Sequence, residues 1–542
     1  MNRLICVALL IAAIDTPVHS AEVSPTGFTP AAVAAALNQC GAGDTLVLQA
    51  GTYELDNSLR LRSGIKLVGA GQEKTMLTYT GDKADPFIYL NECDDVEVAH
   101  LTLDGRARKL GQTGIIAENS RRLYLHHLTI RNLIKGSGEF VHGILFTGHN
   151  PTMERGVVDS RIEDCLFENI GVGAEYGGGI RMAWGSNRNR VERNVVKTTG
   201  RGGIFGDHSS DLVIRHNQVS GSGGEGLGLE IWGGCPRSLI EDNVVDHWLS
   251  VDRGECTAVR RNTVGTDDGS IKGIGIEIIA RDVIVTDNVV KRGALIGLSV
   301  SNIPEKNNVF WGYNSVSDCL EWGAQFQGET GGIAHHYLYR CDFQRTVHGD
   351  PRAPYADASG HGFRINGMTR QMVFEDCTFG NNDGFGLQTC GDGVDELSFL
   401  RCTFVGNREG LAVGFGPAHR VAFADCTARH NGNDAYPPTT KLTTPTPVAE
   451  FAVPDKLIAG EPIRFACQSK PGTGKIVERL WDFNHGIAET EPNPTHTFDT
   501  PGKYRVTLIV WDEAGRGARA EKTIEVVGRS DAKTRTQRVF AH

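Results

Sequence analysis

The segment VIVTDNVV, residues 283–290, holds the unit from which most of this chain is built. An apolar run suited to a short strand, Val283–Thr286, precedes Asn288, and a second apolar pair, Val289–Val290, follows it. The same unit returns every 19 to 26 residues, with its asparagine at Asn194, Asn217, Asn243, Asn262, Asn288 and Asn314. A repeat of this period is typical of a solenoid, in which each coil covers the apolar face of the coil before it. We therefore predict stacked coils whose asparagine side chains satisfy the amides of the neighbouring turn.

A glycine-led strand completes each coil, and GLGLEIWGG at residues 226–234 is its most unusual copy. Alternate side chains of a strand point to opposite faces, so Leu229 and Ile231 face one way while Glu230 and Trp232 face the other. In several coils a cysteine takes the place of the asparagine, at Cys165, Cys341, Cys377, Cys402 and Cys426. A cysteine in that position is predicted to be a small buried side chain rather than a nucleophile.

Residues 28–432 resemble the right-handed parallel β-helix superfamily of pectate-lyase-like proteins. The resemblance rests on the coil period, the repeated asparagine and the opening segment GDTLVLQAGTYEL, residues 43–55. The Ala-rich segment Phe28–Gln39 is predicted to be a helix that caps the first coil, because an open end would expose both core and strand edge. The resemblance implies an all-β solenoid with a substrate groove along one outer sheet. Many unrelated polysaccharide enzymes share that scaffold, so it implies no single activity.

A second domain is indicated beyond residue 447. Residues 433–447 are rich in Pro and Thr and are predicted to be a linker. Residues 448–527 contain WDF at 481–483 and PGKYRVTL at 501–508. They resemble the PKD domain, which implies a small immunoglobulin-like β-sandwich. The polar residues 528–542 are predicted to be a disordered tail.

Composition limits the class of function. The chain has 542 residues, a net charge of −10 and no basic tract, which argues against nucleic acid as a partner. Residues 1–21 are predicted to be a signal peptide, because one early cation precedes a short apolar run and small residues. No later segment is apolar over a membrane-spanning length, so we expect a secreted or periplasmic monomer. In such a compartment Cys235 and Cys256 are candidates for a disulfide, a pairing that the sequence leaves open.

The outward positions of the glycine-led strands hold few charged residues at both ends of the solenoid and many between residues 181 and 277. The predicted catalytic residues are Glu230, Asp207, Glu277, Asp252 and His208. The predicted substrate-binding residues are Trp232, Arg181, Arg201 and Arg364. The ring of Trp232 suits stacking on a sugar, and Arg181 suits a carboxylate or sulfate. The expected partner is therefore a polysaccharide.

The spacing of the carboxylates favours glycoside hydrolysis with inversion. Strands stacked about 4.8 Å apart put Glu230 and Asp252 close enough to repel, and place the backbones of Glu230 and Glu277 roughly 9–10 Å apart. Asp207 and Glu230, on adjacent coils but offset by two residues along the strand, are expected to be roughly 8 Å apart. Inverting glycosidases hold two carboxyl groups at about 6.5–9.5 Å. A uronate lyase and a non-catalytic carbohydrate-binding solenoid stay open as alternatives, and a lyase would use Ca²⁺ held by Asp207, Glu230 and Asp252. Without HExxH or a paired CxxC, no other metal-ligand set is predicted.

Overall fold

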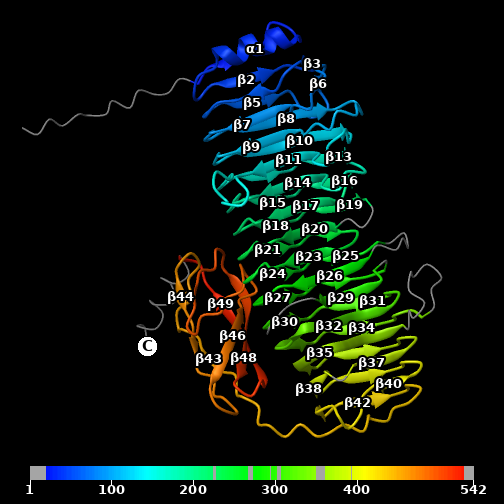
Figure 1. The fold of residues 1–542 in the computed structure, drawn as a ribbon. Helices are drawn as coiled ribbons and strands as arrows, with labels where there is room; N and C mark the ends of the chain where they lie inside the picture. The colour runs from blue at the N-terminus through cyan, green and yellow to red at the C-terminus, as the bar shows by residue number, and fades with distance from the viewer. Residues whose placement is uncertain are drawn as a thin grey trace, which may run out of the picture.

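The structure is a computed structural model that describes residues 20–223, 227–266, 273–292, 294–301, 307–348, 360–391 and 393–529. Residues 1–19 of the predicted signal peptide, Gly226 of the glycine-led phrase and residues 530–542 of the predicted tail lie outside the described residues. The described chain forms a long solenoid of parallel strands with a small antiparallel body beside it (Figure 1). In this described part of the chain, no helix is long and apolar enough to cross a membrane.

The helix α1, Pro30–Gln39, covers the first coil, as predicted (Figure 1). Thr29 is its N-cap, and the Thr29 side chain accepts a hydrogen bond from an amide of the first turn. Proline at the first helical position costs no hydrogen bond, because an amide at that position would have no partner within the helix. Val33, Ala36 and Leu37 are buried against the solenoid core. The cap therefore shields the apolar end of the first coil from water.

Each coil contributes to three parallel sheets, which we name the site sheet, the docking sheet and the third sheet. The glycine-led strands form the site sheet, which carries the predicted functional residues. Its strands are β4 (Leu59–Arg60), β7 (Ile88–Asn91), β9 (Ile115–Glu118), β11 (His142–Thr147), β14 (Gly178–Ala183), β17 (Gly202–Asp207), β20 (Leu227–Trp232), β23 (Leu249–Asp252), β26 (Ile274–Ile279), β29 (Ile296–Ser301), β32 (Trp322–Ile333), β35 (His361–Glu375), β37 (Phe385–Cys390) and β40 (Gly410–Val413).

The docking sheet holds the strands that precede the asparagine turns, and the end of β35 joins it. Its other strands are β1 (Glu22–Val23), β2 (Thr45–Leu48), β5 (Lys66–Gly69), β8 (Glu97–Asp104), β10 (Tyr124–Leu133), β12 (Arg161–Glu163), β15 (Arg190–Glu192), β18 (Val213–Arg215), β21 (Leu239–Glu241), β24 (Ala258–Arg260), β27 (Val283–Thr286), β30 (Val309–Gly312), β33 (His336–Tyr339), β38 (Asp395–Leu400) and β41 (Val421–Ala424).

The third sheet holds the strands that follow the turns, together with the later halves of β8 and β10. Its other strands are β3 (Gly51–Leu55), β6 (Thr75–Tyr79), β13 (Leu166–Ile170), β16 (Val195–Thr199), β19 (Gln218–Ser222), β22 (Val244–Val245), β25 (Thr263–Val264), β28 (Val289–Val290), β31 (Ser315–Ser317), β34 (Asp342–Gln344), β36 (Thr378–Gly380), β39 (Thr403–Val405) and β42 (Thr427–Arg429).

The asparagine ladder is present, as predicted. The side-chain amide of Asn217 donates to Oδ1 of Asn243 at 3.0 Å, and that of Asn243 donates to Oδ1 of Asn262 at 3.0 Å. The backbone amides of Asn217 and Asn243 donate to the same two oxygens. Four of the five cysteines at these positions are buried, as predicted, whereas Cys426, in the last coil, is only half-buried. Cys165 donates its amide to the first asparagine of the ladder, and Cys341 lies beside the last.

The register of the glycine-led strands departs from prediction at the last coil. The repeat pattern puts Ala412 beside Gln388 in the outward column. In the structure Val413 pairs with Gln388, and Ala412 pairs with the core residue Leu387. The difference arises because β40 starts opposite Phe385, one residue earlier than the repeat indicates. A one-residue slip moves every side chain of a strand to the other face.

The antiparallel body is a β-sandwich with its own core, as predicted. Its strands are β43 (Phe451–Ala452), β44 (Ile463–Arg464), β45 (Ala466–Cys467), β46 (Ile476–Asp482), β47 (Thr495–His496), β48 (Gly502–Asp512) and β49 (Gly517–Val526). The core includes Trp481, Phe483, Phe465, Phe498, Val506 and Leu508. Both parts of the all-β prediction, parallel β-helix and small sandwich, are thus confirmed.

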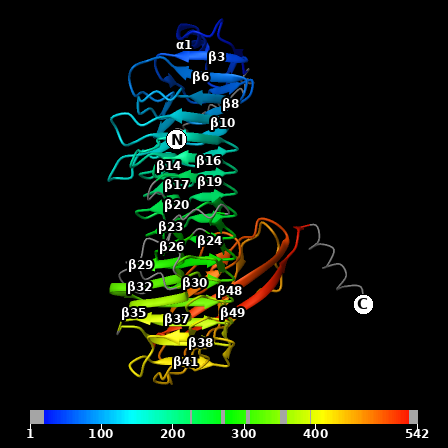
Figure 2. The same cartoon turned by 90° about the vertical axis from the view of Figure 1, so that its right-hand side faces the viewer.

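The sandwich folds back and packs on the docking sheet (Figures 1 and 2). The shared apolar contact joins Leu239, Ala258, Ile284, Phe310, Tyr337, Tyr339 and Val373 of the solenoid to Leu480, Ala488, Ile509 and Trp511 of the sandwich. Arg260 and Asp482 form an ion pair of 3.3 Å across this contact, with both side chains buried. Arg519 of the sandwich also pairs with Glu375 of the solenoid at 2.9 Å.

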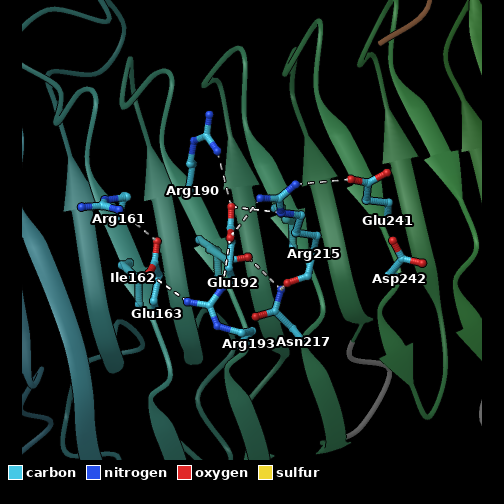
Figure 3. A network of polar contacts seen from close by, with 12 residues as sticks. Arg161, Ile162, Glu163, Arg190, Glu192, Arg193, Arg215, Asn217, Glu241 and Asp242 are labelled. Atoms are coloured by element: carbon cyan, nitrogen blue, oxygen red, sulfur yellow. Dashed lines mark hydrogen bonds and ion pairs between the residues drawn. The ribbon is translucent and has the colours of Figure 1, made fainter. Parts of the chain in front are cut away.

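Next to the sandwich, the same sheet carries a ladder of ion pairs on its outer face (Figure 3). Glu192 lies 3.2 Å from Arg193 and 3.1 Å from Arg215, and Arg193 also lies 2.9 Å from Glu163. These coils precede the apolar contact residues in the chain. The outer face of the docking sheet therefore carries ion pairs on these coils, and mainly apolar residues, with Arg260 and Glu375 among them, where the sandwich covers it.

Candidate functional site

Three neighbouring strands, β14, β17 and β20, bring predicted site residues together. Arg181 lies opposite Phe205, and Phe205 lies opposite Glu230. Asp207 lies opposite Trp232. The alternate positions of each strand fill the solenoid core, so these five side chains share the outer face.

A cavity of about 200 Å³ lies over these strands. It is lined by Tyr176, Arg181, Arg201, Phe205, Gly206, Asp207, Glu230 and Trp232. Two carboxyl groups, two guanidinium groups and three aromatic rings thus meet in one place. The ring of Tyr176 stacks on Phe140 at 5.0 Å, and the two residues are 37% and 58% exposed. This pair extends the aromatic surface beyond the strands.

Glycines make room for two rings at the site. A Cβ on Gly202 would lie 2.1 Å from the ring of Phe205, so only glycine lets that ring fold back along β17. A Cβ on Gly233, whose φ is +67°, would lie 2.3 Å from the ring of His208. Glycine is therefore required for space at both positions, and at Gly233 also for its positive φ.

Glu230 is 6% exposed although it faces the cavity. Its pKa is raised to about 7: burial is the largest cause, the charge of Arg201 lowers the pKa, and the charges of Asp252, Glu277 and Asp207 raise it. The Arg201 guanidinium lies 3.4 Å from Oε1 of Glu230. A carboxyl group with a pKa near 7 is present in both protonation states at neutral pH, as proton transfer requires.

Asp207 has a partner for each of its carboxylate oxygens. Arg181 forms an ion pair with Oδ2, and Nδ1 of His208 lies 2.6 Å from Oδ1. The ring of His208 stacks on Trp184 at 4.4 Å and meets the edge of Trp232 at 5.4 Å. The Asp207–His208 pair is thereby held in one orientation beside the cavity.

Glu277 and Asp252 do not line the cavity. Ser250 stands between Glu230 and Glu277 in the strand register, so the two glutamates are two coils apart, as the spacing predicts. Oε2 of Glu277 accepts hydrogen bonds of 3.0 Å from Trp248 and from Ser250. Burial raises the pKa of Glu277. Both residues therefore act on the electrostatics of Glu230 from outside the cavity.

Arg364 lies apart from this group. It belongs to β35, where it pairs with Gln325 of β32, and its guanidinium sits over the ring of Trp322 at 4.6 Å. Sequence reasoning missed Trp184 and Trp248, which contact His208 and Glu277. Both tryptophans adjoin the ends of glycine-led strands, outside the outward columns, and no pattern marked them.

The three carboxylates proposed for Ca²⁺ do not form a cation site. Asp207 and Glu230 each face an arginine instead. Asp252 pairs with Arg253 at 3.2 Å. Among the described residues, one group of three has its ligand atoms within 4.8 Å of one another, namely His100, His126 and His127.

The disulfide between Cys235 and Cys256, which the sequence leaves open, is not formed, and both residues are free thiols in the structure.

Known families match both parts of the fold. Residues 86–248 match the model of the right handed beta helix region, and residues 444–527 match the PKD domain. The chain is a β-helix protein with a C-terminal PKD domain. Residues 178–340 of this β-helix protein also match the model described as periplasmic copper-binding protein (NosD).

Two curated relatives match the β-helix protein over short segments. Collagenase ColQ1 of Bacillus cereus (strain Q1) is 47% identical over 58 residues, 11% of this chain and 6% of the relative. The microbial collagenase of Vibrio alginolyticus is 36% identical over 88 residues, 16% of this chain and 11% of the relative. The chain thus spans about a tenth of these relatives or less. Among solved structures, a mannuronic acid specific polysaccharide family 6 lyase from human gut microbiota is 16% identical, with a TM-score of 0.44, over 66% of this chain and 87% of that chain.

Proposed function

We propose that this protein is an exported enzyme that cleaves an acidic polysaccharide in the cavity over β14, β17 and β20. The observation that carries the proposal is that Asp207 and Glu230 line one cavity with Arg181 and Arg201. Carboxyl groups transfer protons, and arginines bind the carboxylate or sulfate groups of an anionic sugar. Trp232, 42% exposed, offers a face on which a sugar ring stacks.

Glycoside hydrolysis is the reaction that the carboxyl groups support best. Glu230, with its pKa of about 7, donates a proton to the glycosidic oxygen. The Asp207–His208 pair accepts the proton of the attacking water. Asp207 and Glu230 stand on adjacent strands and two residues out of register, which separates them by roughly 8 Å. That separation leaves room for water, so we expect inversion of the anomeric centre.

A second candidate is β-elimination from a uronate. It is favoured by the phenol of Tyr176, which lines the same cavity as the two arginines. In this reaction Arg181 and Arg201 would neutralise the carboxylate of the uronate, which makes the proton at the adjacent carbon more acidic. The Asp207–His208 pair would accept that proton, and Tyr176 would donate a proton to the leaving oxygen as the C–O bond breaks and the double bond forms. Both reactions use the same cavity and the same class of substrate.

The proposal of export rests on residues 1–21, which resemble a signal peptide. It agrees with the match to NosD, a family described as periplasmic. Copper binding by residues 178–340 is not part of the proposal. In the part of that range that the structure describes, no three His, Cys, Asp or Glu side chains converge as metal ligands would.

The proposal is tested with a panel of uronate, sulfated and neutral polysaccharides. Wild type, Glu230→Gln and Asp207→Asn are assayed for new reducing ends and for the absorbance of unsaturated products. We expect turnover on an anionic polymer, and a loss of about a hundredfold or more in each variant. Ser299→Ala, in the same outward column but outside the cavity, serves as the matched control and should keep its activity.

The products decide between the candidates. Reducing ends without unsaturated sugar indicate hydrolysis, and unsaturated ends indicate elimination. Full activity in Glu230→Gln and Asp207→Asn would show that the cavity is not the active site. Binding of a glycan without cleavage, by wild type as well as by the variants, would indicate a carbohydrate-binding solenoid and not an enzyme.

A further inference from the structure

Three histidines converge on the docking sheet, away from the cavity. His100 belongs to β8, and His126 and His127 belong to β10, which stacks directly on β8 (Figure 1). Their ligand nitrogens all lie within 4.8 Å of one another. Nδ1 of His126 and Nδ1 of His127 are 2.9 Å apart. Three imidazole rings thus surround a single point on the surface.

The stacking of the coils explains this convergence. Ala99 lies opposite His126 and Leu101 opposite Leu128, so His100 and His127 occupy the same position in successive coils. Both have positive φ, +58° and +50°, at the bend that leads from the docking sheet to the third sheet. Stacked strands are about 4.8 Å apart, which brings rings at equivalent positions into contact.

Burial disfavours the charged form of one of the three rings, that of His126. His126 is 7% exposed, and burial lowers its pKa. Glu97 raises that pKa, while the neighbouring rings of His127 and His100 lower it, because like charges repel. Neutral imidazole is the form that binds transition metals.

One histidine is oriented by contacts that are typical around metal ligands. Nε2 of His126 lies 3.3 Å from a carboxylate oxygen of Glu97, and the ring stacks on Tyr124 at 4.0 Å. Histidines that bind metals commonly donate their second ring N–H to a carboxylate. This contact leaves Nδ1 of His126 facing the other two rings.

We propose that His100, His126 and His127 bind one divalent transition-metal ion of the zinc and copper class, with water in the remaining positions. Imidazole nitrogen suits both ions. Nitrogens about 2.0–2.1 Å from a tetrahedral ion stand about 3.4 Å apart, which small rotations of these rings reach. The ion joins β8 to β10, and it lies on a different sheet from the proposed active site.

The test uses the untagged full-length protein, stripped with a chelator and dialysed. Zn²⁺ and Cu²⁺ are titrated separately by calorimetry and in competition with a chromophoric chelator. We expect one ion per chain, and a loss in affinity of at least about tenfold in His100→Asn and in His127→Asn. Asparagine tolerates positive φ, so the backbone is not strained by either change. The spectrum of bound Cu²⁺ should show nitrogen hyperfine splitting that both variants lose or weaken.

His216→Asn is the matched control, because exposed His216 occupies the same bend on a later coil, with φ +57°. It should bind metal as wild type does. Thermal melting of the metal-free forms checks that each variant folds, and added Zn²⁺ should raise the Tm of wild type but not that of His100→Asn. Equal affinity in wild type and in the His100→Asn/His127→Asn double variant would overturn the proposal. So would a loss of binding in His216→Asn alone.

Discussion

At the scale of single residues, the carboxyl group of Glu230 is held in a cavity that shields it from water, with Arg201 as its cationic neighbour. Burial outweighs that neighbour and raises the pKa of Glu230 to about 7. A buried charge costs free energy unless it is fully paired. The same environment that suits Glu230 to proton transfer therefore lowers the stability of the fold once the group ionises.

Replacing Glu230 by glutamine should change stability in a pH-dependent way. A carboxyl group whose pKa is higher in the folded chain than its ordinary 4.5 stabilises the fold most below that value, and the stability is lost as pH rises through about 7. We expect wild type and Glu230→Gln to unfold alike near about pH 4, and the variant to be more stable by about 3 kcal/mol near about pH 8. Urea unfolding at the two pH values measures this. Glu73→Gln, at an exposed position, should show no such difference, and a constant effect across pH in Glu230→Gln would contradict the expectation.

Two neighbours of Glu230 should shift the pH profile in opposite directions. Asp252 raises the pKa of Glu230 and Arg201 lowers it. If Glu230 is the proton donor, the alkaline limb of kcat/KM moves to lower pH in Asp252→Asn and to higher pH in Arg201→Gln. Profiles measured on the polymer that wild type cleaves provide the test. Shifts in the same direction would assign the limb to another group.

At the scale of the elements, a coil is held to its neighbour by its turn as well as by its strands. Asn243 is buried, and its side chain donates to the carbonyl of Ile214 at 2.9 Å and to Asn262. Its Oδ1 accepts from both amides of Asn217. The residue before it has positive φ, which is costly for a side chain other than glycine. The ladder therefore offsets a strained bend that recurs from coil to coil.

Removing one rung should destabilise the whole solenoid. In Asn243→Ala the buried amide of Asn217 loses its acceptor, and each unsatisfied buried group costs about 1–3 kcal/mol. We expect the free energy of unfolding to fall by about 3 kcal/mol, which lowers the midpoint of thermal unfolding. A second ladder runs from Asn382 through Asn407 to Asn431, whose side-chain amides donate from each asparagine to the next. Asn431→Ala removes its half-buried last rung and should cost less. An equal loss at both positions would show that burial does not set the energy of a rung.

At the scale of the whole molecule, the PKD domain is docked rather than tethered (Figure 2). It covers the apolar part of the docking sheet, whereas the cavity belongs to the site sheet. The sandwich therefore leaves the cavity uncovered. Arg260 is fully buried in the contact, and Asp482 supplies the opposite charge.

Loss of Asp482 should release the sandwich. Asp482→Ala leaves the charge of Arg260 buried without a partner, and breaking such a pair costs about 3–5 kcal/mol. We expect faster proteolysis within residues 433–447 and a larger radius of gyration in small-angle scattering. Asp395→Ala breaks an ion pair with the exposed Arg420 and should have little effect. The double variant Arg260→Met/Asp482→Ala has no buried charge, so the compact form should return. If Asp482→Ala were cleaved at the wild-type rate, the apolar contact alone would be sufficient to hold the sandwich on the solenoid.

The sequence by itself determined the architecture. The spacing of Asn217, Asn243 and Asn262 set the coils, because a side chain that must bind its equivalent in the next coil leaves a period that can be read directly. Alternation in the glycine-led strands put Glu230 and Trp232 outward for the same reason: strand geometry is local and periodic. The small sandwich was likewise predictable from local motifs.

Tertiary structure alone decided what surrounds those side chains. It showed that Glu230 is buried, that Glu277 and Arg364 lie outside the cavity, and that Trp184 supports His208. Burial depends on loops of irregular length, which carry no period. The docking of the PKD domain and the meeting of the three histidines depend on surfaces distant in sequence or on stacking between coils. Repeating backbone geometry is written into a sequence, whereas contacts between non-repeating side chains exist only once the coils are stacked.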